Sequence, residues 1–146
     1  MDVLTEPAVT SRGGRPRWRL AAYWLSTAGA AAELGAGGAL DITGNPAVRN
    51  LVAHLGYPSY FLVLLGTWKM LGAVALLIPG RALLKEWAYA GAFFTYTGAV
   101  VSHLTTGYAL GEVPVLIFLI ALTVASWALR PPSRRPPRAA AGAPRR

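Results

Sequence analysis

Long apolar segments alternate with short polar ones along most of this chain, and four of them have the length of membrane-spanning helices. They cover about residues 18–40, 58–78, 84–104 and 113–129. A helix that rises about 1.5 Å per residue needs about 20 residues to cross the hydrocarbon core of a bilayer. The pattern therefore predicts an all-α, polytopic membrane protein built as a bundle of four transmembrane helices.

A short amphipathic helix is expected in the first outer connection, residues 41–57. Asn45 is a favourable N-cap, and Pro46 suits the first helical position. Gly56 then offers a natural stop. Between them, apolar residues recur at helical spacing: Val48, Leu51, Val52 and Leu55. We expect this helix to lie on the outer membrane interface.

The distribution of charge orients the predicted spans. The chain has 14 Lys and Arg against 6 Asp and Glu, a formal net charge of +8. Twelve of these 14 basic residues lie in or within two residues of the two tails and the second connection, whereas the outer connections hold only Arg49. Since Lys and Arg collect on the cytoplasmic side, both termini are predicted to be cytoplasmic. Basic tails around an apolar middle also argue against a nucleic-acid partner.

The tails, residues 1–17 and 131–146, are polar and basic, and the second is also rich in proline. We expect both to be disordered, with the membrane domain between them at 18–130. The C-terminal arm would lie near anionic lipid headgroups, as an orientation anchor or as a lipid or partner site. A secretory signal peptide is the alternative for the first segment, with cleavage near Ala28 to Ala32. It would leave three spans, with the termini on opposite faces.

Two charged residues fall inside the predicted spans, where an unpaired charge costs several kcal/mol. Glu33 and Lys69 differ in depth by about 6 Å at the helical rise, and consecutive spans are usually neighbours. They are therefore predicted to pair, either as a proton or anion site or as a structural ion pair. Small residues share their helix faces and predict close packing: Ser26, Ala30 and Gly37 on the first span, and Gly66, Gly72 and Ala73 on the second.

The third span carries a polar and aromatic stripe on one face: Glu86, Tyr89, Phe93, Tyr96, Val100 and His103. Tyr96 falls at about the depth of Lys69. The predicted intramembrane polar core therefore comprises Glu33, Lys69, Tyr96 and His103. A quinone headgroup could stack there and accept a hydrogen bond from Lys69, Tyr96 or His103. Ordinary helix packing explains the same stripe.

Further residues complete the candidate site. The candidate ligand-lining residues are Trp68, Tyr89, Phe93 and Ser102, and the inner-turn charges are Arg81, Lys85 and Glu86. No catalytic motif is present. His54, His103 and the scattered carboxylates lack metal-ligand spacing, so no metal is expected, and haem ligation by the two histidines is a weak alternative. The absence of cysteine excludes disulfides and thiolate ligands within the chain.

An ordered series of polar residues and glycines resembles a known family. It consists of Gly38 to Asp41 with Asn45-Pro46, His54 to Pro58, Gly66 to Leu71, Pro79-Gly80, Lys85 to Gly91, and Gly98-Ala99 with Ser102-His103. The series resembles the DoxX-like family of small bacterial membrane proteins, over about residues 22–129. The resemblance implies a four-helix bundle in the bacterial cytoplasmic membrane. It also implies membrane or cytoplasmic redox partners, because the family name comes from a subunit associated with a thiosulfate:quinone oxidoreductase and other members are linked to membrane oxidoreductase complexes that respond to oxidative stress.

Three functions follow as expectations. The first is a membrane subunit that works with quinone-linked or oxidative-stress partners and has no stand-alone activity. The second is a small transporter or channel subunit with Glu33 and Lys69 on its pathway, which predicts a homo-oligomer because four spans are few for a carrier. The third is a membrane scaffold in which the polar pair is only structural.

Overall fold

The computed structural model describes residues 16–134, and every regular element in that range is helical. The long helices are α1 (Arg17–Ile42), α3 (Tyr60–Leu77), α4 (Ala82–Thr106) and α5 (Val113–Leu129). The short elements are α2 (Pro46–His54) and two 3-10 turns, η1 (Leu110–Glu112) and η2 (Pro132–Arg134). These bounds match the four predicted segments closely. Most of the two predicted disordered tails lies outside the described residues.

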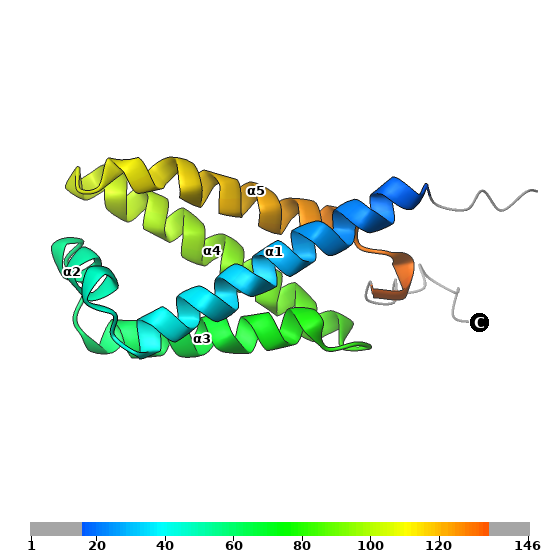
Figure 1. The fold of residues 1–146 in the computed structure, drawn as a ribbon, viewed down its shortest axis with the longest axis horizontal. Helices are drawn as coiled ribbons and strands as arrows, with labels where there is room; N and C mark the ends of the chain where they lie inside the picture. The colour runs from blue at the N-terminus through cyan, green and yellow to red at the C-terminus, as the bar shows by residue number, and fades with distance from the viewer. Residues whose placement is uncertain (1–15, 135–146) are drawn as a thin grey trace, which may run out of the picture.

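The four long helices pack in a ring. α1 packs along α3 and α5, and α4 packs along the same two helices from the other side. The α4–α5 connection and α2 lie at one end of the molecule, whereas the α3–α4 turn and both ends of the described chain lie at the other (Figure 1). Four antiparallel neighbours with short connections produce this arrangement.

The predicted short amphipathic helix is confirmed as α2. The side-chain oxygen of Asn45 accepts a hydrogen bond from the backbone N–H of Ala47 at 3.0 Å, and Pro46 is the first helical residue. The helix ends before Gly56, which adopts a φ of +89° that most residues disfavour. Val52 is buried against the rest of the protein. The placement of α2 on a membrane interface stays a prediction.

The four long helices bury polar side chains beside an apolar core that includes Leu34, Leu76 and Tyr89. The buried polar side chains are Ser26, Thr27, Asp41, Lys85, His103, Thr123, Ser126 and Arg130. Many of the largest apolar side chains are exposed instead, among them Trp18, Leu25, Leu64, Trp68, Trp87 and Phe118. A protein surrounded by water normally buries such residues, and large exposed apolar patches are typical of surfaces that contact a membrane or another protein.

Within residues 16–134, two helical stretches are long and apolar enough to cross a membrane: Tyr60–Leu77 and Leu110–Leu129. α1 and α4 are longer, at 26 and 25 residues, but they do not reach the same hydropathy. Glycines, hydroxyl groups and charged residues lower it in both. Hydropathy alone therefore identifies two of the four predicted spans.

α1 and α3 approach most closely at Gly38 and Gly66. A Cβ atom on Gly66 would lie 2.6 Å from the Gly38 carbonyl oxygen and 2.9 Å from the Cβ of Asp41. A Cβ atom on Gly38 would lie 2.9 Å from the Gly66 carbonyl oxygen. The two backbones are therefore in direct contact, as small residues allow. This contact sets the rotation of both helices and brings Lys69, one turn after Gly66, against α1.

Candidate functional site

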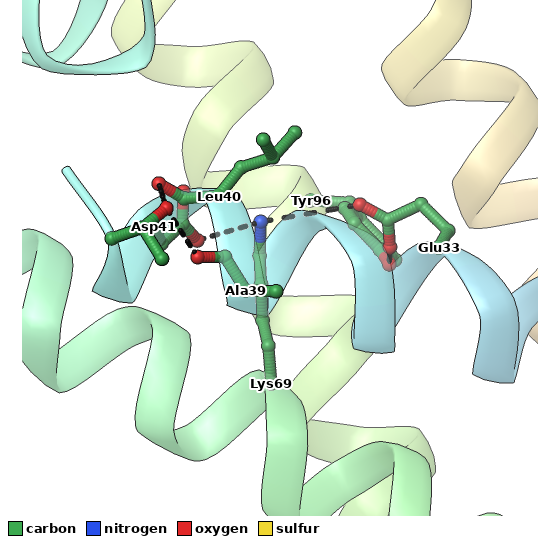
Figure 2. A network of polar contacts seen from close by, with 7 residues as sticks. Glu33, Ala39, Leu40, Asp41, Lys69 and Tyr96 are labelled. Atoms are coloured by element: carbon green, nitrogen blue, oxygen red, sulfur yellow. Dashed lines mark hydrogen bonds and ion pairs between the residues drawn. The ribbon is translucent and has the colours of Figure 1, made fainter. Parts of the chain in front are cut away.

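Lys69 lies at the centre of a polar network between three helices. Its side chain extends from α3 toward α1, and the amine lies between two carboxylates of that helix (Figure 2). The Lys69 Nζ is 3.1 Å from Asp41 Oδ2 and 3.9 Å from Glu33 Oε1. The Tyr96 hydroxyl of α4 donates a hydrogen bond to the other oxygen of Glu33. Two carboxylates thus face one ammonium group, which leaves a formal excess of one negative charge.

The structure brings Glu33 and Lys69 together as predicted, but Asp41 is the nearer partner and was missed. The sequence analysis placed Asp41 in the first outer connection, whereas α1 continues through Ile42. Asp41 follows Glu33 by about two helical turns, so the two carboxylates share one face of α1. That spacing was the sequence signal from which Asp41 could have been predicted as part of the site. The side chain of Asp41 is only 5% exposed, against 25% for Glu33.

A chamber of about 470 Å³ adjoins the network. α2 and the segment that follows it form one wall, α3 and α4 form another, and α1 contributes the two carboxylates. Its apolar lining includes Val48, Leu51, Val52, Leu55, Phe61, Leu65, Phe94 and Leu116. Its polar lining comprises Glu33, Asp41, Tyr57, Lys69, Thr95, Tyr96, Ser102, His103 and Glu112. Mostly apolar walls with a few convergent polar groups are typical of a small-molecule site.

Side-chain contacts at the α2 end hold the chamber together. The Tyr57 hydroxyl lies 2.7 Å from Ser102 Oγ, which joins the segment after α2 to α4. The ring of His54 stacks on Tyr108 with centroids 4.5 Å apart. His103 Nδ1 lies 2.8 Å from the Tyr108 carbonyl oxygen. Since that carbonyl only accepts, Nδ1 carries the proton, and the Nε2 of a neutral ring is left as an acceptor.

Comparison with models of known protein families matches residues 25–126 to the DoxX-like family. The chain belongs to the DoxX-like family. The matched range runs from α1 into α5 and includes every residue that lines the chamber. No curated protein matches the chain. No solved structure matches it either.

Three of the predicted ligand-lining residues of this DoxX-like protein lie outside the chamber. Trp68 is 66% exposed on the outer surface, and Phe93 is also exposed. Tyr89 is buried toward the other end of the helices, where its hydroxyl lies 2.8 Å from Ser126 Oγ. Ser126 in turn lies 2.7 Å from the hydroxyl of Thr27. Of that set only Ser102 lines the chamber, and the aromatic lining comes instead from Tyr57, Phe61, Phe94 and Tyr96.

Two of the three predicted inner-turn charges, Lys85 and Glu86, make structural contacts. Lys85 is almost completely buried, and its amine donates to the carbonyl oxygens of Ala75, at 3.0 Å, and Leu76. These belong to the carbonyls that the C-terminal turn of α3 leaves without helical partners. Glu86 forms an ion pair with Arg130 at 2.7 Å. Arg81 is exposed. Among residues 16–134, no three His, Asp or Glu side chains are grouped so that they could hold a metal ion.

Proposed function

We propose that α1, α3, α4 and α5 all cross the bacterial cytoplasmic membrane, with both termini on the cytoplasmic side. The exposure of large apolar side chains on α1 and α4 supports this, because Trp18 and Trp24 of α1 and Trp87 of α4 are exposed. The carboxylates of the same two helices are paired with Lys69 or Arg130. The start of α1, the α3–α4 turn and η2 lie at one end of the molecule (Figure 1) and include Arg17, Arg19, Arg81 and Arg134, whereas α2 at the opposite end includes Arg49. This asymmetry follows the positive-inside rule.

Single cysteines test the four spans, because the chain has none of its own. We expect a membrane-impermeant maleimide to label Ser59→Cys in intact cells, and Ser11→Cys and Ser133→Cys only after permeabilisation. Ser59 precedes α3 and Ser133 follows α5, and both are exposed. Labelling of Ser11→Cys and Ser133→Cys from opposite sides would contradict the arrangement. Loss of residue 11 from the mature chain would favour a cleaved leader.

We propose that the chamber binds the headgroup of a quinone, and that the protein serves as a quinone-linked subunit beside a redox partner. The observation that supports this proposal is that apolar and aromatic side chains line the chamber together with the Lys69 amine. A quinone has a flat ring with two carbonyl acceptors, so it needs both features. The volume of 470 Å³ lies within the about 300–1,000 Å³ usual for small-molecule pockets.

The residues of this chain would bind and orient the head. Lys69 and Thr95 are lining groups with N–H or O–H donors for a carbonyl oxygen, whereas the O–H of Ser102 already donates to the Gly98 carbonyl oxygen at 2.9 Å. Reduction of a quinone to a quinol takes two electrons and two protons. In this proposal the partner supplies the electrons, and the carboxyl groups of Glu33 and Asp41 are acid–base groups in the chamber wall that can pass protons.

Quinone binding is testable with a glycine variant that fills the chamber. Gly98 lines the chamber, and a Cβ atom there would meet nothing within 4 Å. Gly98→Leu should therefore fold, since glycine is a poor helix former. We expect it to weaken binding of 2,3-dimethoxy-5-methyl-1,4-benzoquinone at least tenfold, or about 1.4 kcal/mol, measured by quenching of tryptophan fluorescence in nanodiscs.

Gly35→Leu is the matched control. Gly35 lies on α1, has no neighbour within 4 Å of an added Cβ, and does not line the chamber. Its binding should equal that of the unchanged protein. Absence of saturable binding to the unchanged protein would reject the quinone site. Solute flux in proteoliposomes that disappears in Glu33→Gln would favour the transporter, and capture of a redox partner without ligand binding would favour the scaffold.

A further inference from the structure

An apolar groove runs along the outer surface where α3 meets α4. Its volume is about 320 Å³. From α3 it is walled by Leu64, Trp68 and Leu71, and from α4 by Leu84 and Trp87. The two tryptophans are 66% and 69% exposed, so the groove opens to the surroundings of the protein. In the four-span arrangement proposed above, those surroundings are the bilayer.

The groove and the chamber share part of their walls. Phe61, Leu65, Lys69 and Thr95 line both of them. On α3 the groove is lined from Phe61 to Ala75, a length of about 21 Å at the helical rise. Lys69 and Thr95 are the only lining residues of the groove with polar side-chain groups besides the two indoles. The chamber and the apolar groove are therefore adjacent, with these four residues in the wall that they share.

Glycines on α4 keep this route open. Gly91 lines the groove and Gly98 lines the chamber, and their seven-residue spacing puts them on the same face of the helix. An added Cβ atom would meet nothing within 4 Å at either position. Glycine inside a helix costs about 0.5–1 kcal/mol relative to alanine. Neither glycine is needed for close helix packing. The absence of a side chain at these two positions instead leaves space in the groove and in the chamber.

We infer that the ligand is a tailed quinone of the bilayer, with its head in the chamber and its isoprenoid tail in the groove. The inference rests on the proposed quinone-binding function. It names the substrate class, because a water-soluble quinone or solute would gain nothing from an apolar groove beside Lys69. The head reaches the chamber sideways from the lipid, past Trp68 and Trp87, and the tail stays between α3 and α4.

Two probes separate head from tail: 2,3-dimethoxy-5-methyl-1,4-benzoquinone, and the same head with a decyl tail. Binding is measured in nanodiscs, and the partition of each probe into protein-free nanodiscs is subtracted. We expect the tail to improve the affinity of the unchanged protein at least tenfold beyond partitioning. Gly91→Leu should abolish this gain and leave the head-only affinity unchanged. Gly98→Leu should weaken both probes, and Gly35→Leu should weaken neither.

The outcomes distinguish the two proposals. An equal tail gain in Gly91→Leu and the unchanged protein would overturn the groove inference while the quinone site stands. Absence of saturable binding of either probe to the unchanged protein would reject both. A diazirine at the end of the tail should label Leu84 or Trp87 of the same chain. Labelling of a second copy, or a change of oligomeric state in Gly91→Leu without loss of tail affinity, would identify the groove as a contact between copies instead.

Discussion

Replacement of Lys69 by methionine is expected to destabilise the protein by about 3–5 kcal/mol, the usual cost of breaking a buried ion pair from one side. The substitution preserves most of the side-chain volume but removes the ammonium group. Asp41, whose side chain is 5% exposed, would then lose its counter-charge. Glu33 would lose the same ammonium group, which lies 3.9 Å from its carboxylate. Unfolding by SDS titration in mixed micelles, followed by circular dichroism, measures the change.

Neutralisation of the partner should reverse most of this loss. The double variant Lys69→Met with Asp41→Asn removes both charges of the 3.1 Å ion pair, so that no buried carboxylate is left at residue 41 without its cation. We expect the double variant to regain more than half of the stability that Lys69→Met loses. Glu33→Gln in place of Asp41→Asn should recover less, because Glu33 lies at 3.9 Å and is more exposed. A Lys69→Met protein as stable as the unchanged one, or a double variant no better than the single, would contradict a structural role for the pair.

Gly66→Val is expected to lower the free energy of unfolding by at least about 3 kcal/mol, at the upper end of the usual cost of overpacking. The added Cβ would lie 2.6 Å from a backbone oxygen of α1, which has no alternative rotamer to adopt. α1 and α3 must therefore separate or rotate. Either movement also carries Asp41 away from Lys69, so the packing defect adds to a loss of the ion pair.

The same substitution at an open glycine provides the comparison. Gly91→Val meets no neighbour within 4 Å of its Cβ, and we expect its stability to lie within about 0.5 kcal/mol of the unchanged protein, as for most surface substitutions. Thermal unfolding in detergent compares the two variants directly. Equal stability of Gly66→Val and Gly91→Val would show that α1 and α3 do not touch at Gly38 and Gly66.

Element bounds and the pairing of helices were accessible from sequence because they depend on spacing along one chain. The predicted segments agree with the long helices to within a few residues, and the Asn45-Pro46 signal located α2 correctly. The depth of Lys69 and Glu33 along their helices was enough to predict that they meet. Asp41 was missed because one helix end was set two residues too early, which moved a buried carboxylate into a loop.

The rotation of each helix about its axis was not accessible in the same way. Trp68 and Phe93 were predicted to face a ligand, and both face outward. Helical spacing says which residues share a face, but the neighbouring helix decides where that face points. Here the decision comes from the contact of Gly38 with Gly66, and the pattern of small residues on the first span did not include Gly38. Lys85 shows a related limit, because its carbonyl acceptors at the end of α3 exist only in the folded protein.

The position of both carboxylates on α1 has a consequence for biosynthesis. α1 leaves the ribosome first and carries Glu33 and Asp41, whereas their cation arrives only with α3. Until then, a lone α1 in the hydrocarbon core would hold two uncompensated acidic groups, each of which costs several kcal/mol there. In the four-span arrangement, α1 and α3 are therefore expected to enter the bilayer from the translocon as one hairpin, with the short helix α2 as its turn.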